Sequence, residues 1–189
     1  MPVSVARPDI LQLLRRGTHH QHAALEQLEF NRALGAGTVS AEATARFLGK
    51  LYGFLLPYEA ALEQRAAEFG PSWEIGQRRR AHLIRLDLPA ADALPLCPQL
   101  PPLHTRAQLL GAMYVLEGST LGGQLIARQL TQAGIPLRRY FSGYGELTGP
   151  RWKTFCQLLA AEADETNQAA IVASAALTFE RLHAWIEQP

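Results

Sequence analysis

The chain has 189 residues, 48% hydrophobic and 19% charged, a composition typical of a folded globular protein and unlike that of a disordered chain. Its 18 basic and 17 acidic residues nearly cancel, which argues against a nucleic acid or an anionic membrane as partner. Two distant cysteines argue against a disulfide framework, no apolar run reaches the roughly 18 residues of a membrane span, and the first ten residues lack a secretory signal, so we expect a soluble cytoplasmic protein.

Helical periodicity dominates the first half of the chain. A first helix is predicted over residues 9–29, and a second one begins after Ser40, a typical N-cap residue. Pro57 lies in the apolar stripe of this second helix and predicts a kink or a break, because proline removes one backbone donor. A third helix is predicted over residues 72–86, and its arginine triplet at positions 78–80 is interpreted as a solvated helix face.

The second half begins with a proline-rich loop over residues 89–102, the only candidate domain boundary. A cut there would leave two small helical pieces with incomplete cores, so we predict a single domain over residues 1–189. Thr105 can cap a helix that continues to about residue 132, and two last helices are predicted over residues 150–163 and 166–186. Because no alternating strand pattern occurs, the predicted fold class is all-α.

Gly111, Gly118 and Gly122 fall on one narrow stripe of the helix that follows Thr105, because separations of seven and four residues return to the same face. Each glycine in a helix interior costs about 0.5–1 kcal/mol relative to alanine. The pattern leaves two explanations open for this cost. A neighbouring helix packs closely against the bare face, or a flat ligand lies across it.

The first predicted helix carries three histidines in the stretch "THHQHAALE". His20 and His22 flank the apolar stripe, whereas His19 points away from it. Glu26 follows His22 by one turn and lies on the same side of the helix. A metal-bound histidine usually donates its second N–H to an oxygen acceptor, which Glu26 could supply. An ordinary surface pair remains the alternative.

A different metal chemistry is conceivable near the C-terminus. Glu180 and His183 form one Glu-x-x-His unit. Di-iron sites in helical bundles need two such units and further carboxylates, and the sequence contains only one. The sequence therefore favours a di-iron enzyme less than a protein that uses one of the N-terminal histidines.

Two longer motifs resemble a known family. "LRRGTHHQHAALE" and "MYVLEGSTLGGQLIARQL" resemble the iron-ligand helix and the glycine-rich distal helix of heme oxygenases, particularly the bacterial, biliverdin-producing branch. Other segments, such as "FLGKLYGFLLPYEAALE" and "RWKTFCQLLAAEADE", occur in the order expected for that family, so the resemblance covers nearly the whole chain. It implies an all-α multi-helix fold with heme between a proximal helix and a glycine-kinked distal helix.

The resemblance also implies roles for individual residues. His22 matches the proximal iron ligand and Glu26 its hydrogen-bond partner. Gly118 and Gly122 match the glycines that flank the oxygen site, with Gly123 beside them.

Four further positions carry weaker expectations. Arg15 and Lys153 fall where the family places cations for the heme propionates, and Phe179 matches an apolar position in the pocket wall. Ser119 stands where animal members carry an aspartate that organises water above the iron, so the resemblance leaves proton delivery undefined.

The resemblance implies an oxidoreductase that uses heme b as both cofactor and substrate. With O2 and electrons it would cleave a meso carbon to give biliverdin, CO and ferrous iron. The chain has no GxGxxG fingerprint and no cysteine cluster, so the electrons would come from a separate reductase or ferredoxin. A bacteriophytochrome could accept the biliverdin, and iron acquisition is an equally compatible purpose. A heme carrier of the same fold without turnover, and a helical interaction module, remain alternatives.

Overall fold

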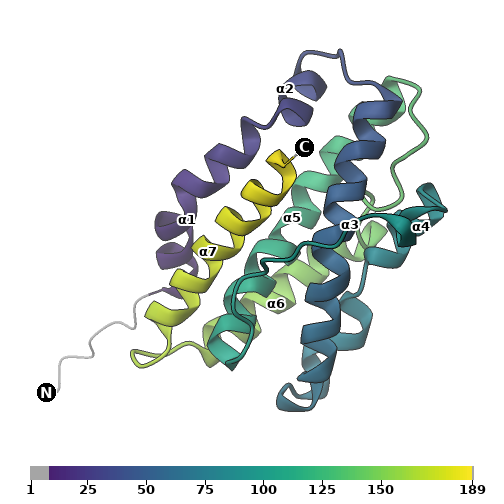
Figure 1. The fold of residues 1–189 in the computed structure, drawn as a ribbon. Helices are drawn as coiled ribbons and strands as arrows, with labels where there is room; N and C mark the ends of the chain where they lie inside the picture. The colour runs from purple at the N-terminus through teal and green to yellow at the C-terminus, as the bar shows by residue number, and fades with distance from the viewer. Residues whose placement is uncertain (1–8, 189) are drawn as a thin grey trace, which may run out of the picture.

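The computed structural model describes residues 9–188, so most of the N-terminal stretch used for the signal-peptide prediction lies outside the described residues. No strand occurs between residues 9 and 188, which confirms the all-α prediction. Seven α-helices follow one another (Figure 1): α1 Ile10–Glu26, α2 Glu29–Gly35, α3 Ala41–Gln64, α4 Ala81–Asp87, α5 Arg106–Gln132, α6 Thr148–Glu162 and α7 Gln168–Glu187.

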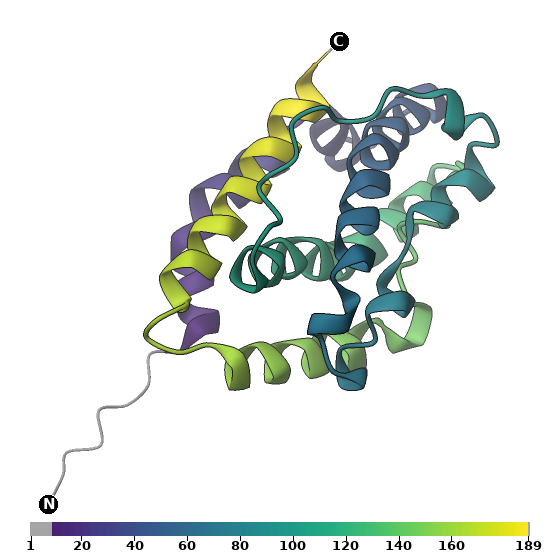
Figure 2. The same cartoon turned by 60° about the horizontal axis from the view of Figure 1, so that its bottom comes forward.

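Helix α5 runs through the middle of the molecule, with α1 and α7 along one side and α3 crossing it (Figure 2). Helix α7 packs against both α1 and α5 and so joins the two helices that carry the predicted site residues. Its contact with α1 is close at Gly17, where an added Cβ would lie 2.5 Å from Cγ1 of Val172. Among the described helices, none combines the length and apolar character required to cross a membrane.

The helix that carries the glycines begins where the sequence predicts. The Thr105 hydroxyl accepts a hydrogen bond from the backbone N–H of Gln108, and the Gln108 side chain accepts one from the backbone N–H of Thr105, which completes a capping box. The second predicted helix is confirmed as α3, and the Ser40 hydroxyl accepts from the N–H of Ala43.

Pro57 does not divide α3, which continues from residue 41 to residue 64. The missing N–H of Pro57 would leave the carbonyl of Gly53 without its helical donor. The backbone N–H of Cys97 donates to that carbonyl at 2.9 Å, so the proline-rich loop replaces the lost hydrogen bond. Gly53 permits this approach, because a Cβ there would lie 2.5 Å from the carbonyl oxygen of Pro95 in the same loop.

Two predicted helices are shorter than expected. The first ends at Glu26 because Leu28 adopts an extended conformation, and α2 then starts separately. The helix predicted over residues 72–86 is wrong: 3-10 turns precede α4, and Glu74 between them has a left-handed backbone with φ 48°. A regular helix cannot pass through such a residue.

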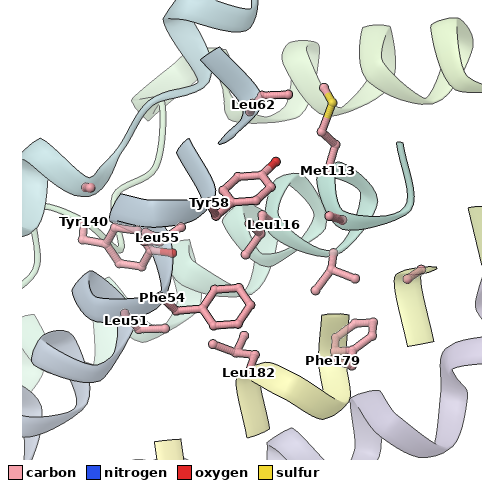
Figure 3. Packing of buried hydrophobic residues seen from close by; sticks show 14 of the residues in the cluster. Leu51, Phe54, Leu55, Tyr58, Leu62, Met113, Leu116, Tyr140, Phe179 and Leu182 are labelled. Carbon is pink, nitrogen blue, oxygen red and sulfur yellow. The ribbon is translucent and has the colours of Figure 1, made fainter. Parts of the chain in front are cut away.

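Helices from both sides of the proline-rich loop contribute to the same hydrophobic core. Figure 3 shows Phe54 of α3 close to Leu182 of α7, with Leu116 of α5 nearby. Each of these side chains is buried. Residues before and after the loop therefore share this core, and the single domain over residues 1–189 stays a prediction.

Candidate heme site

The four glycines of α5 fall into two groups. Gly111 and Gly123 are packing positions, because a Cβ on Gly111 would lie 2.7 Å from Cβ of Ser174, and a Cβ on Gly123 would lie 2.8 Å from the carbonyl oxygen of Phe141. Contacts this short are not tolerated by real side chains without movement of the neighbours. Close packing therefore explains these two glycines without any ligand.

Gly118 and Gly122 belong to the other group. A Cβ on Gly118 would reach ordinary contact with the Trp152 ring at 3.4 Å, and a Cβ on Gly122 would meet nothing within 4 Å. Gly122 and the neighbouring Leu121 are exposed. Packing therefore does not explain Gly122, and the bare backbone of α5 faces open space there.

The proximal side of the candidate site is formed by α1. His19, His20 and His22 are all exposed, but only His22 has a ring contact with α7, edge-on to Phe179 with 5.7 Å between the ring centroids. The Nδ1 atom of His22 lies 3.4 Å from Oε1 of Glu26, which leaves Nε2 as the nitrogen turned away from this pair. With 61% of the His22 side chain exposed, the imidazole is accessible to a ligand.

A small, partly open cavity of about 120 Å³ begins one turn beyond His22. Its walls include Leu25 of α1, Ser119 and Gly123 of α5, and Leu182 of α7. The lining is mostly apolar, and its polar residues are Asn31, Arg80, Ser119, Thr120 and Tyr140. His22 itself does not line this cavity, although Leu25, three residues later on α1, does.

The two predicted propionate cations lie on different helices. Arg15 of α1 is exposed, and its charge acts on Tyr114 of α5 and Cys156 of α6. Burial raises the pKa of both groups, whereas Arg15 opposes that rise. Lys153 is exposed on α6 beside Trp152, whose ring lies 5.7 Å from the Tyr114 ring. Arg15 therefore stands near the edge where α5 and α6 meet.

The arginine triplet is not the solvated helix face that the sequence predicts. Arg78 and Arg80 are only 5% and 3% exposed, whereas Arg79 is exposed. The segment is extended at Arg79, with φ −72° and ψ 126°, so alternate side chains point to the same side. The sequence analysis assumed a helix over the triplet and therefore missed this alternation. A strand-like period of two residues would have indicated it.

Arg78 belongs to a buried polar network that includes Glu117 of α5. Its Nη1 atom lies 2.6 Å from Oε2 of Glu117, and the Tyr144 hydroxyl donates to Oε1 of the same carboxylate at 2.9 Å. Burial raises the pKa of the Tyr144 phenol above its usual range, and the charge of Glu117 adds to the rise. The sequence analysis assigned no role to Glu117 or to this network.

Ser119 is exposed toward the site, and its hydroxyl donates to the carbonyl of Leu116 at 2.7 Å. The hydroxyl proton is therefore used in a hydrogen bond within α5. A serine in this state presents only its oxygen lone pairs to the cavity and cannot replace the acidic function of an aspartate.

A larger cavity of about 900 Å³ lies between α2, α3 and the end of α7. It shares Leu28, Phe47 and Ile186 with the small cavity. None of the residues predicted for the site lines it, and the glycines of α5 lie elsewhere. Volume alone would favour this cavity as the candidate heme site. The exposed His22 on α1 and the open Gly122 on α5 instead favour the space between these two helices.

The di-iron alternative finds no support. Glu180 accepts a hydrogen bond from Gln21, and His183 pairs with Glu187 at 3.4 Å. Within residues 9–188, no group of three or more histidine, cysteine, aspartate or glutamate side chains is placed to hold a metal ion. A single imidazole beside an open space instead fits a metal that brings its own equatorial ligands.

Comparisons with known proteins point to one family. The "Heme oxygenase" family model matches residues 8–94. A protein of Xanthomonas campestris pv. campestris named "Heme oxygenase" is 29% identical over 161 residues, which cover 80% of this chain and 93% of that protein.

Two solved structures have similar folds. Heme oxygenase from Leptospira interrogans superposes with a TM-score of 0.79 at 18% identity, covering 94% of this chain and 98% of that chain. Heme oxygenase-1 from the cyanobacterium Synechocystis sp. PCC6803, in complex with heme, gives a TM-score of 0.69 at 17% identity, covering 94% and 90%.

The molecule is an all-α protein whose fold matches that of the two heme oxygenase structures. The family match and the curated relative extend that similarity to the sequence. These findings support the heme oxygenase family as the one that this chain resembles.

Proposed function

We propose that this protein is a heme oxygenase of the bacterial, biliverdin-producing branch, which cleaves heme at a meso carbon to biliverdin, CO and ferrous iron. Two observations support the proposal: the imidazole of His22 on α1 is accessible, and a Cβ on Gly122 of α5 would meet nothing within 4 Å. The family-model match over residues 8–94 and the curated relative support the same conclusion.

The residues present fit a porphyrin. Known small-molecule sites occupy about 300–1,000 Å³, so the small cavity of about 120 Å³ would hold only part of the ring. The rest would lie in the open part of the site, where a side chain on Gly122 would occupy its place. The apolar walls at Leu25 and Leu182 suit the ring, and the single imidazole suits its iron.

Each side chain then has a defined task. His22 would bind the iron through Nε2, and Nδ1–H would donate a hydrogen bond to Glu26, which fixes the tautomer and the ring orientation. Arg15 and Lys153 are the proposed partners of the propionates, for which arginine and lysine are suited. Gly118 and Gly122 would let the backbone of α5 approach the distal face.

Bound heme supplies the iron at which O2 is activated and is itself the molecule oxidised. The protein limits the outcome by position, because a reacting group held within about 3–3.5 Å of one carbon is strongly favoured over others. We propose a separate reductase or ferredoxin as the electron donor, a cytoplasmic location, and iron acquisition or bilin supply to a bacteriophytochrome as the purpose.

Titration of the purified protein with hemin, followed by reduction with ascorbate or a ferredoxin system in air, tests this function. We expect one-to-one binding, loss of the Soret band and extraction of biliverdin, with release of CO. A stable Soret band without biliverdin would overturn the enzymatic proposal. That outcome would support a heme carrier, which the hydrogen-bonded state of the Ser119 hydroxyl favours.

Gly122→Leu is expected to weaken hemin binding roughly 10- to 100-fold, because the new side chain would occupy the distal face. Gly35→Leu is the matched control, because a Cβ at Gly35 also meets nothing within 4 Å but lies on α2. Urea unfolding of both apo-variants should stay within about 1 kcal/mol of wild type. Equal hemin affinity in the two variants would contradict the proposed position of the heme.

A further inference from the structure

Helix α5 exposes two leucines beside its open glycine. Leu121 and Leu125 are 43% and 58% exposed, and they lie one residue before and three residues after Gly122. They share one face of the helix with Gly118 and Gly122, because the four residues are spaced three, one and three apart. At Gly122 this face is open, since an added Cβ would meet nothing within 4 Å. The exposed leucines therefore continue the bare stripe at the proposed heme site.

The two sides of this stripe have different neighbours. On one side lies the small cavity, whose walls on α5 are Leu116, Ser119, Thr120, Gly123 and Ile126. Leu121 and Leu125 line neither the small cavity nor the larger one. Helical spacing places them on the other side of Gly122 from Ser119. A flat ring that faces Gly122 would thus have the small cavity along one side and the two leucines along the other.

The two ends of the stripe also differ. At the Gly118 end, the Trp152 ring lies 3.4 Å from the position of an added Cβ, and the exposed Lys153 follows Trp152 on α6. Arg15 of α1 acts electrostatically on Tyr114, one turn before Gly118. The cations proposed for the propionates therefore lie at the Gly118 end, whereas the leucines lie at the Gly122 end. Heme b has a matching division, with propionates at one edge and only vinyl and methyl groups elsewhere on its rim.

We propose that Leu121 and Leu125 are heme-contact residues, which cover part of the apolar rim of the porphyrin while its propionates lie at the Gly118 end. The proposal rests on the proposed function and adds the orientation of the ring. Apolar surface that leaves water on binding stabilises the complex, and about half of each leucine is available for this in the free protein. A propionate over the same leucines would lose water without gaining a partner, which is unfavourable.

Leu125→Lys tests both the contact and the orientation. Hemin affinity should fall about fivefold or more, because the variant places a charge against the apolar rim and loses part of the burial of one leucine. Metal-free protoporphyrin IX should show the same fall, which separates this contact from iron coordination by His22. Leu125→Ala should lower both affinities by less. A rise in hemin affinity in Leu125→Lys would place the propionates at the leucines and would overturn the proposal.

Leu86→Lys is the matched control, because Leu86 is 57% exposed but lies on α4. Its hemin affinity should stay within about twofold of wild type. Lysine is a good helix former, so urea unfolding of both apo-variants should resemble that of wild type. Equal hemin affinities in Leu125→Lys and Leu86→Lys would contradict the contact.

Sedimentation of the apo-protein tests a second copy of the chain as the occupant of the leucines. We expect the same sedimentation for wild type and Leu125→Lys. A wild-type dimer that Leu125→Lys dissociates would assign the leucines to a subunit interface and would overturn the proposal.

The outcomes separate this inference from the proposed function. If wild type binds hemin and produces biliverdin but its affinity is indifferent to Leu125, the function stands and the inference fails. If wild type does not bind hemin, both fail.

Discussion

Glu117→Ala is expected to lower the free energy of unfolding by about 3–5 kcal/mol, because the variant leaves the Arg78 guanidinium buried without its counter-charge. Both side chains of this ion pair are at most 5% exposed, so water cannot replace the lost carboxylate. The Tyr144 hydroxyl would lose its acceptor as well. The total is a large fraction of the stability of an ordinary domain.

Urea unfolding followed by circular dichroism measures this loss. Glu42→Ala is the matched control, because Glu42 also pairs with an arginine, Arg46, at 2.6 Å, but on the exposed face of α3. An exposed pair of this kind contributes about 0–1 kcal/mol. If both variants lost the same small amount, Glu117 and Arg78 would not form the buried pair that holds α5 against the 3-10 turns.

Local signals in the sequence were sufficient to predict the long helices. The Ser40 and Thr105 caps are side-chain hydrogen bonds within one turn, and the apolar stripes of α3, α5 and α7 are long enough to define their faces. The segment after α3 was predicted wrongly, because the left-handed Glu74 has no strong signal in a single sequence.

Local spacing along a helix was also sufficient to predict part of the candidate site. The pairing of His22 with Glu26 follows from helical spacing alone, and the structure places their polar atoms 3.4 Å apart. The glycine stripe was ambiguous, since spacing does not tell packed Gly111 from open Gly122. Arg80 could not be found from spacing, because its burial depends on contacts with α5, 36 residues later in the chain.

Replacing His22 is expected to have the largest effect on heme binding. Loss of the iron ligand should reduce hemin affinity and turnover by more than the roughly 10- to 100-fold change that follows when only the hydrogen-bond partner of a metal-bound histidine is removed. Because 61% of the side chain is exposed, His22→Ala should leave the free energy of unfolding within about 0.5 kcal/mol of wild type. Glu26→Ala should show the smaller change.

The iron–histidine stretching band in the resonance Raman spectrum of the ferrous heme complex tests the central claim most directly. His20→Ala is the matched control, because His20 is exposed on the same helix and lacks the contact with Phe179. The band should be present in wild type and in His20→Ala, and absent in His22→Ala. Persistence of the band in His22→Ala, or its loss in His20→Ala, would show that the iron is held elsewhere.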